Sequence, residues 1–447
     1  MLILAILVVV AAIVLLARRV DVRLVLLGAG LMLCVLAGTP LLAADTFTRG
    51  MVTAMVAPIC ASMGFAAVIA RTGCDAELVR LLLAPLSKVR ALALPGGILA
   101  AYIVNLAIPS QASTAASLGP ILIPLLTAAG FDVAVSGAAL ILGASFGGDL
   151  LNPGAQDVQS IAGVASVSAA DISTLVVPAS LAGIAAAATA FALFNRPSAP
   201  VAPRARTGMD GDGAIESAAG AIESAAGAAP RVNVLKALVP VLPVTMLLLA
   251  YAGWEPMRWL VTIPEGDAWK PLTGALPVVR AMLLGTVVAG ALAWRDVRSI
   301  ARSLFEGMGH AYGSIISLTI TAQVFGAGVA AAGIADALLR LASGSSALAL
   351  LSTAFPWALS VLSGSGSGPI LAYAQTFLAS HGADPHLARN AALACLGGAF
   401  GRTSSPVSAV VVYSSGLVDR SPLVVLRLVL VPLLIGAAVS IAVVLLR

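Results

Sequence analysis

The chain has 447 residues, of which 60% are hydrophobic and 10% are charged, and its formal net charge is +5. Soluble domains carry about 25% charged residues, so this composition excludes a soluble globular protein and predicts a chain that crosses a membrane many times. We therefore interpret the surplus of positive charge as a signal of membrane orientation and not as a surface for nucleic acid.

Long apolar runs predict about ten helices of membrane length. The first run has no basic segment before it and is followed by Arg18 and Arg19, which predicts a retained helix and not a cleaved signal peptide. The runs span residues 2–17, 23–43, 51–70, 133–149, 172–194, 234–252, 276–294, 308–332, 387–401 and 423–446.

Two further apolar segments are each interrupted by a centre rich in small polar residues. Residues 91–130 contain "IPSQASTAAS", and residues 346–380 contain "SGSGSGP". Each apolar arm is on the short side for a span, so both segments are predicted to form re-entrant hairpins. Polar breaks interrupt the helices that follow, which predicts broken helices over 133–165 and 387–418. Non-helical backbone at membrane depth has to be buried in protein or line a water-filled cavity.

A stretch rich in Pro, Ala and Gly covers residues 196–233, and "AIESAAG" occurs in it twice. This composition predicts a low-complexity linker between two parts of the chain, 1–195 and 234–447. The two parts share short motifs in the same order: "TFTRGM" with "SLFEGM", "GPIL" with "GPIL", "SFGGDLLNP" with "AFGRTSSP", and "VVP" with "LVP". Motifs repeated in one order predict an internal duplication.

The distribution of Lys and Arg predicts the orientation of the chain. If each hairpin returns to the side from which it starts, most of these residues fall in loops on one side. The positive-inside rule makes that side cytoplasmic, together with the linker, and places both termini outside. Each half then crosses the membrane an odd number of times, so the two halves have opposite orientations. The predicted fold is an all-α membrane protein of about ten transmembrane helices in two inverted repeats, each with a re-entrant hairpin and a broken helix.

Hairpin tips and helix breaks that face each other across a pseudo-twofold axis predict a binding site near the membrane midplane. The N-terminal ends of half-helices offer free N–H donors and positive partial charge, which suit an anion. Arg402, in "GRTSSP", is the only Lys or Arg that we expect deep in the membrane. Its guanidinium can bind a carboxylate with two parallel hydrogen bonds. A salt bridge to Asp149 or Asp157 is the structural alternative, and snorkelling to the membrane surface is another.

Further candidates surround the same tips and breaks. Asp149 and Asp157 flank "LLNPGAQ" and are candidates for carrying a coupling proton or helping to hold sodium, with helix capping beside Pro153 as the alternative. We expect no resident cofactor or metal, and no C-x-x-C pair occurs among the four cysteines. The candidate substrate ligands are Ser110, Gln111, Ser113, Thr114, Asn152, Ser363, Gly364, Ser365, Gly366, Ser367, Arg402, Thr403, Ser404 and Ser405.

The C-terminal stretch "GRTSSPVSAVVVYSSGLVDRSPLVVLRLVLVPLLIG" resembles the same stretch of DcuC-type C4-dicarboxylate carriers. "SGSGSGP" resembles a Gly-Ser-Gly segment of that family, and "NPGAQD" resembles its Pro-x-x-Gly-Asp element. The resemblance implies the fold of the ion transporter superfamily, with a scaffold domain, a mobile transport domain and often a homodimer. It also implies a substrate such as succinate, fumarate or malate, and transport by an elevator mechanism in the bacterial inner membrane.

We therefore expect a secondary carrier, coupled to protons or sodium or working as an exchanger, and not an enzyme. A carrier of another organic anion, such as a tricarboxylate, a monocarboxylate or an acidic amino acid, is the nearest alternative. An anion channel is a third class, which differs from a carrier by showing neither saturation nor counterflow. "GASFG" fits the hydrolase pattern G-x-S-x-G, but it lies inside an apolar helix and lacks the strand–turn–helix context of that motif.

Overall fold

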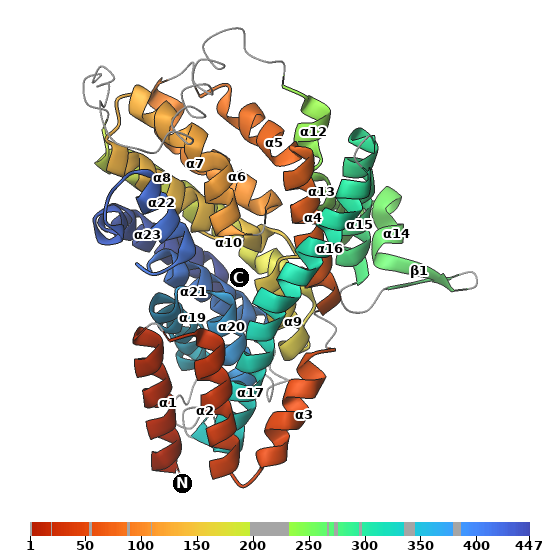
Figure 1. Cartoon of the computed structure of the whole chain (residues 1–447), viewed down its shortest axis with the longest axis vertical. Helices are drawn as coiled ribbons and strands as arrows, with labels where there is room; N and C mark the ends of the chain where they lie inside the picture. Colours follow the sequence, from red (N-terminus) through yellow and green to blue (C-terminus); the bar gives the residue numbers. More distant parts are fainter. Residues whose placement is uncertain are drawn as a thin grey trace.

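The structure is a computed structural model and is mainly helical (Figure 1). The predicted linker 196–233 lies almost entirely outside the described residues. The structure describes residues 2–18, 20–52, 56–86, 90–108, 110–196, 232–265, 268–271, 276–294, 297–334, 345–378 and 386–447.

The first half of the chain forms helices of very different lengths. Its hairpin consists of α6 and α7, and its broken helix consists of α8, the short helical turn η1 and α9. The bounds are α1 (Leu2–Ala17), α2 (Val22–Leu36), α3 (Pro40–Gly50), α4 (Val56–Thr72), α5 (Cys74–Leu83), α6 (Arg90–Ala107), α7 (Gln111–Ala128), α8 (Val133–Ser145), η1 (Asp149–Leu151), α9 (Gln156–Ala165) and α10 (Ala169–Phe194).

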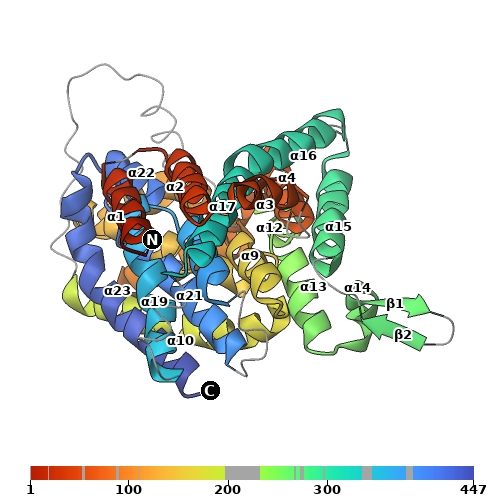
Figure 2. The ribbon, with the colours of Figure 1, turned by 90° about the horizontal axis from the view of Figure 1, so that it is seen from below.

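The second half contains a hairpin (α19 and α20) and a broken helix (α21 and α22) in the same order, and a short β-hairpin follows α14, in which β1 and β2 pair antiparallel. Figure 2 shows that β-hairpin projecting from the helices. The bounds are α12 (Val234–Leu238), α13 (Leu242–Tyr251), α14 (Arg258–Val261), β1 (Thr262–Glu265), β2 (Ala268–Pro271), α15 (Leu276–Leu292), α16 (Val297–Ala311), α17 (Ser317–Ala331), α19 (Ser345–Ser363), α20 (Ser367–Tyr373), α21 (Leu387–Thr403), α22 (Ala409–Leu417) and α23 (Pro422–Leu445).

Several predicted helix boundaries are wrong, and glycine and proline explain most of the differences. The run 23–43 is not one helix, because Gly38 adopts a φ of +75° after α2 and Pro40 begins α3. The run 234–252 is divided into α12 and α13, with Pro243 in the first turn of α13. Apolar periodicity cannot reveal such breaks, because the side chains on both sides of each break remain apolar.

Two further differences concern helical residues that lie outside the predicted runs. The predicted run 308–332 begins too late, because α16, a π-helical segment at Tyr312–Ile316 and α17 follow one another from Val297 to Ala331. Helix α5 was not predicted, and it bends away from α4 by 74°. Gly73 lies at that bend with a φ of +70°.

Four helical stretches within the described residues are long and apolar enough to cross a membrane. They are Val133–Leu151, Ala169–Phe194, Arg298–Ala331 and Pro422–Leu445, and the bent pair α4–α5 passes the same test as one broken span. Shorter apolar helices of 10–17 residues accompany them. These lengths fit a multi-pass membrane protein that mixes full spans with shorter helices.

The two halves make matching contacts within themselves. Helix α8 packs on α6, and α21 packs on α19. A Cβ atom at Gly143 in α8 would lie 2.4 Å from the Ile98 carbonyl oxygen of α6. A Cβ atom at Gly397 in α21 would lie 2.4 Å from the Thr353 carbonyl oxygen of α19. The same close backbone approach therefore holds the hairpin arm against the following helix in each half.

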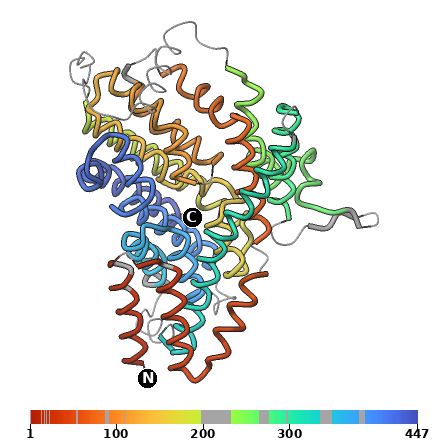
Figure 3. Tube along the Cα trace, in the orientation of Figure 1, coloured from red at the N-terminus to blue at the C-terminus, as the bar shows by residue number. Residues whose placement is uncertain are grey.

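The halves also contact each other reciprocally. Helix α7 contacts α22 while α20 contacts α9, and α10 packs along α23 (Figure 3). A Cβ atom at Gly183 would lie 2.7 Å from the Gly436 carbonyl oxygen, and a Cβ atom at Gly436 would lie 2.6 Å from that of Gly183. A duplicated chain whose halves face each other across a pseudo-twofold axis would make such contacts.

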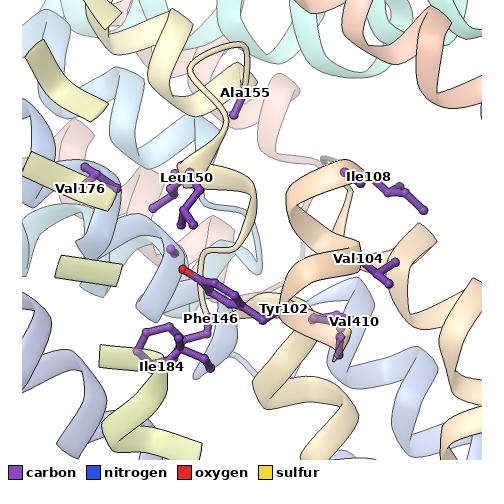
Figure 4. Packing of buried hydrophobic residues seen from close by; sticks show 14 of the residues in the cluster. Tyr102, Val104, Ile108, Phe146, Leu150, Ala155, Val176, Ile184 and Val410 are labelled. Carbon is purple, nitrogen blue, oxygen red and sulfur yellow. The ribbon is translucent and has the colours of Figure 1, made fainter. Parts of the chain in front are cut away.

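An aromatic core lies next to the first break. Phe146, the first residue after α8, packs against Phe400 of α21 with the rings tilted at 54° and 5.1 Å between their centroids. Figure 4 shows Phe146 beside Tyr102 of α6 and Ile184 of α10. The hydroxyl groups of Tyr102 and Ser180 are 2.6 Å apart and hydrogen-bonded. This packing fixes the place where the chain leaves α8.

Candidate functional site

Arg402 lies in the last turn of α21 and contacts acidic residues of the first half. Its Nη2 atom donates to both carboxylate oxygens of Asp149, at 3.0 and 2.9 Å. Its Nη1 atom donates to Oδ2 of Asp157 at 3.1 Å. All three side chains are buried, with 5% or less of each exposed. The salt bridge that was one alternative for Arg402 is therefore present, and it involves both aspartates.

The tips of both hairpins join this cluster. At the first hairpin, Nε2 of Gln111 donates to Oδ2 of Asp149 over 2.6 Å. At the second, the Ser367 hydroxyl donates to Asp157, and Nε2 of Gln156 donates to the Ser367 oxygen over 2.6 Å. One continuous polar network consequently links both hairpin tips with both helix breaks.

Glycine and amide side chains shape the first break, residues 146–155. Gly147 adopts a φ of +112°. A Cβ atom at Gly148 would lie 2.4 Å from the Tyr102 carbonyl oxygen, so only glycine fits there. The Asp149 N–H donates to Oδ1 of Asn105 over 3.0 Å, and Oδ1 of Asn152 accepts from the Gly154 N–H at 2.8 Å. Side chains thus satisfy backbone groups that the interrupted helix leaves unpaired.

In the second half, glycine lets the hairpin tip approach Arg402. Gly364 adopts a φ of +72°. A Cβ atom at Gly366 would lie 3.2 Å from Nη1 of Arg402. Thr403, which follows Arg402 in α21, donates to the Ser145 carbonyl oxygen over 2.7 Å and so connects α21 with the end of α8.

The structure brings together only part of the predicted ligand set. Gln111, Gly366, Ser367, Asp149, Asp157 and Arg402 meet in the cluster. Other candidates bond to nearby backbone or to one another, which leaves their role as substrate ligands a prediction. These are Ser110, Ser113, Thr114, Asn152, Ser363, Ser365, Thr403, Ser404 and Ser405.

Sequence reasoning missed Asn105 and Gln156. Asn105 is a fully buried polar residue in the first arm of the hairpin 91–130. An isolated amide in an apolar arm was a usable signal, because a buried amide needs hydrogen-bond partners. Gln156 stands within "NPGAQD", directly before Asp157, but nothing in that pattern indicated its contact with Ser367.

The cluster contains more acid than base. One guanidinium faces two carboxylates, and Nε of Arg402 is buried without a hydrogen-bond partner. Within the described residues, the only other buried Asp, Glu, Lys or Arg is Asp75, which contacts the Ser117 hydroxyl over 3.2 Å. A charge at the membrane centre costs about 2.5–3.5 kcal/mol on insertion scales, so this concentration of charge makes the cluster the candidate functional site.

No group of three or more His, Cys, Asp or Glu side chains suitable for a metal ion occurs in the described part of the chain. The donors in the cluster are instead those that recognise a carboxylate: a guanidinium, amide N–H groups and a hydroxyl. The site can therefore hold a carboxylate or exchange a proton, and its groups come from both halves of the chain.

Comparison with known proteins identifies relatives over most of the chain. Residues 44–447 match the family described as "DcuC: C4-dicarboxylate anaerobic carrier". The chain is 26% identical over 389 residues to the anaerobic C4-dicarboxylate transporter DcuC of Escherichia coli K12, covering 85% of this chain and 77% of that protein. It is 39% identical over 136 residues to an uncharacterized transporter of Haemophilus influenzae, covering 30% of this chain and 94% of that protein.

A solved structure shares the fold. The Alcanivorax borkumensis YdaH transporter superimposes with a TM-score of 0.56, covering 90% of this chain and 86% of that one. The two sequences are 16% identical, so this likeness concerns the fold alone.

Proposed function

Because this chain belongs to the DcuC family of C4-dicarboxylate anaerobic carriers, we propose that it carries C4-dicarboxylates such as succinate, fumarate or malate across the bacterial inner membrane. Membership in this family makes the protein a transporter and not an enzyme. The observation that supports the substrate class is the buried Arg402, which lies between two hairpin tips rich in hydrogen-bond donors.

In this proposal, Arg402 binds one carboxylate of the substrate. Amide, hydroxyl and backbone N–H groups at the tips, including those of Gln111 and Ser367, bind the other. A dicarboxylate needs a fixed positive charge at this depth because charges there are poorly screened by water. The hydroxyl groups that now bond to local backbone become available to the substrate only if the tips rearrange.

Transport of a dianion requires a compensating cation. Moving one charge across the membrane costs or yields about 2.3 kcal/mol per 100 mV, so an inside-negative potential drives a dianion outward. Uptake therefore needs cotransported protons or sodium, whereas efflux and exchange do not. Asp149 and Asp157 supply the carboxylates that would take up the cation.

Alternating access would follow an elevator mechanism. The hairpins and broken helices form the mobile domain, and the remaining helices form a scaffold within a homodimer. The reciprocal contacts of α7 with α22 and of α20 with α9 support two inverted repeats. Both termini lie outside in this proposal, and the linker lies in the cytoplasm.

Counterflow in proteoliposomes tests the substrate class. Vesicles preloaded with succinate should accumulate labelled succinate, fumarate or malate, and di- and tricarboxylates should be compared with and without sodium. A carrier saturates and shows counterflow, whereas an anion channel shows neither. Preference for a tricarboxylate, a monocarboxylate or an acidic amino acid would move the protein to another class of organic-anion carrier.

Labelling of a cysteine placed at Ser198 tests the orientation. The four native cysteines are buried, so their background labelling should be low. The new cysteine should react with a membrane-impermeant maleimide in inverted vesicles and not in intact cells. Labelling in intact cells would reverse the orientation.

A further inference from the structure

Both terminal nitrogens of the Arg402 guanidinium donate to aspartates of the protein itself. Nη2 donates to both carboxylate oxygens of Asp149, and Nη1 donates to Asp157. Nε is the one nitrogen of this side chain without a hydrogen-bond partner. A substrate carboxylate needs two parallel N–H donors to bind as a bidentate pair. Every such pair includes Nη1 or Nη2, and both of these atoms donate to aspartates, so an aspartate has to leave the guanidinium before the substrate binds in this way.

Asp149 is better placed to leave than Asp157. Asp157 is fully buried and keeps a second partner, Ser367, deep in the cluster. Asp149 instead contacts Gln111, a partly exposed residue at the tip of the first hairpin. The hairpin-tip partner of Asp149 is therefore more exposed than Ser367, the hairpin-tip partner of Asp157.

The surroundings of Asp149 leave few groups that could neutralise it. Helix η1 packs against α6 and α10, which present Tyr102 and Ser180, with their hydroxyl groups bonded to each other. The charged and titratable groups that face Asp149 are Arg402 and Cys395 from α21, Asp157 from α9 and Tyr102 from α6. A proton on Asp149 is the direct way to release Arg402 without leaving an unpaired buried charge.

Gln111 suits both states of this carboxyl group. Its amide N–H donates to ionised Asp149 in the present structure. After protonation, the carboxylic acid becomes a donor, and the amide oxygen of Gln111 can accept from it. The Gln111 side chain can thus hold Asp149 in place with or without Arg402.

We propose that Asp149 occupies the place of a substrate carboxylate on Arg402 in the empty carrier, and that protonation of Asp149 exchanges it for the substrate. This inference rests on the proposed function. One proton is taken up as Asp149 leaves the guanidinium, and the substrate carboxylate forms the ion pair that Asp149 gave up. Gln111 acts as a positioning residue. Substrate binding and proton binding are then coupled at one guanidinium, with no separate coupling site.

Succinate binding to the purified full-length protein tests this competition. The Kd for succinate should be measured between about pH 6.5 and pH 8.5, where succinate is a dianion, in wild type and in Asp149→Asn. In wild type, the Kd should rise about tenfold per pH unit once Asp149 is ionised, because each substrate then brings one proton. In Asp149→Asn, the Kd should be independent of pH and about tenfold or more below the wild-type value at the alkaline end.

Two further variants sharpen the test. Asp132 caps α8 with a hydrogen bond from the Ala134 N–H at 2.8 Å, and asparagine caps a helix equally well, so Asp132→Asn is a matched control. It should keep the wild-type pH dependence. Gln111→Leu removes a hydrogen bond from the ionised form and should move the midpoint of the pH dependence to higher pH. A purely structural role of Gln111 would change the protein yield and not that midpoint.

Infrared spectroscopy of the empty carrier separates this inference from the proposed function. The difference between the spectra of wild type and Asp149→Asn should contain a carboxylic-acid C=O band that appears on acidification. Absence of that band from the difference spectrum, or weaker succinate binding by this variant at every pH, would overturn the inference. Failure of every dicarboxylate to bind wild type would overturn the proposed substrate, while the infrared band would still decide the role of Asp149.

Discussion

In the first half of the chain, the helix that follows the hairpin ends at Ser145 and the break presents Asp149. In the second half, the matching helix continues to Thr403 and carries Arg402 in its last turn. Both helices pack against their hairpin arms through a glycine, Gly143 in α8 and Gly397 in α21. A Cβ atom added at either glycine would lie 2.4 Å from a carbonyl oxygen of the arm. The backbone plan is therefore shared, while the charge at the break is opposite.

The motif alignment "SFGGD" with "AFGRT" shows how this difference is maintained. Arg402 aligns with Gly148, and a side chain at Gly148 would collide with the Tyr102 carbonyl oxygen. Thr403 aligns with Asp149 and instead bonds to the Ser145 carbonyl oxygen. The two halves thus contribute complementary charges to one cluster, and neither half contains a complete cluster of its own.

The largest expected effect comes from removing the basic partner. Arg402→Ala leaves two buried carboxylates without a cation, which should cost about 3–5 kcal/mol and lower the yield of folded protein. Adding Asp149→Asn and Asp157→Asn to Arg402→Ala should restore thermal stability in detergent but not succinate counterflow. Arg402→Lys keeps the charge without the planar fork and should weaken succinate binding strongly. Near-normal succinate uptake by well-folded Arg402→Ala would rule out direct contact with the substrate.

Removing one acidic partner should separate coupling from exchange. Asp149→Asn should lose accumulation of succinate driven by a pH gradient, because this side chain can no longer take up a proton. Succinate/succinate exchange should continue, since exchange does not require the coupling site to unload. If both Asp157→Asn and Asp149→Asn keep accumulation driven by the pH gradient, the coupling cation binds elsewhere.

The glycine contacts test whether the halves are structurally equivalent. Gly143→Ala and Gly397→Ala should each lower the melting temperature through overpacking worth about 1–3 kcal/mol. Gly290 in α15 has no atom within 4 Å of a virtual Cβ, so Gly290→Ala is a matched control and should not lower the melting temperature. Loss of stability in only one of the two glycine variants would argue against equivalent packing in the two halves.

Part of this site could be predicted from the sequence, because charge is scarce in this chain. Arg402, Asp149 and Asp157 stand out against apolar surroundings, and Ser/Gly-rich tips mark interrupted helices. The contacts of Gln111 and Gln156 could not be predicted, since they depend on which hairpin tip approaches which break. Side chains of that kind are recognised only when the tertiary packing is known.

The fold, too, could be predicted from the sequence only in part. Long apolar runs correspond to observed helices such as α10 and α23, because length and composition suffice to predict them. Helix α5 and the β-hairpin were missed because neither is long and apolar. Turns at Gly38 and Gly73 depend on backbone conformation, which hydropathy does not report.

The smallest expected effect lies at the second hairpin tip, where Ser367 connects Asp157 with Gln156. Ser367→Ala removes this hydroxyl without changing any charge, and a hydrogen bond to a charged group contributes about 1.5–3 kcal/mol. In the proposed mechanism the hairpin tips rearrange during transport, so we expect only the lower end of that range, seen as roughly a tenfold higher KM for succinate. Thr127→Ala is the matched control, because its hydroxyl bonds only to carbonyl oxygens of Ile123 and Pro124 within α7. An equal rise in KM for both variants would mean that the effect reflects general loosening of the hairpins, and the link between the second tip and Asp157 would then have no role in substrate binding.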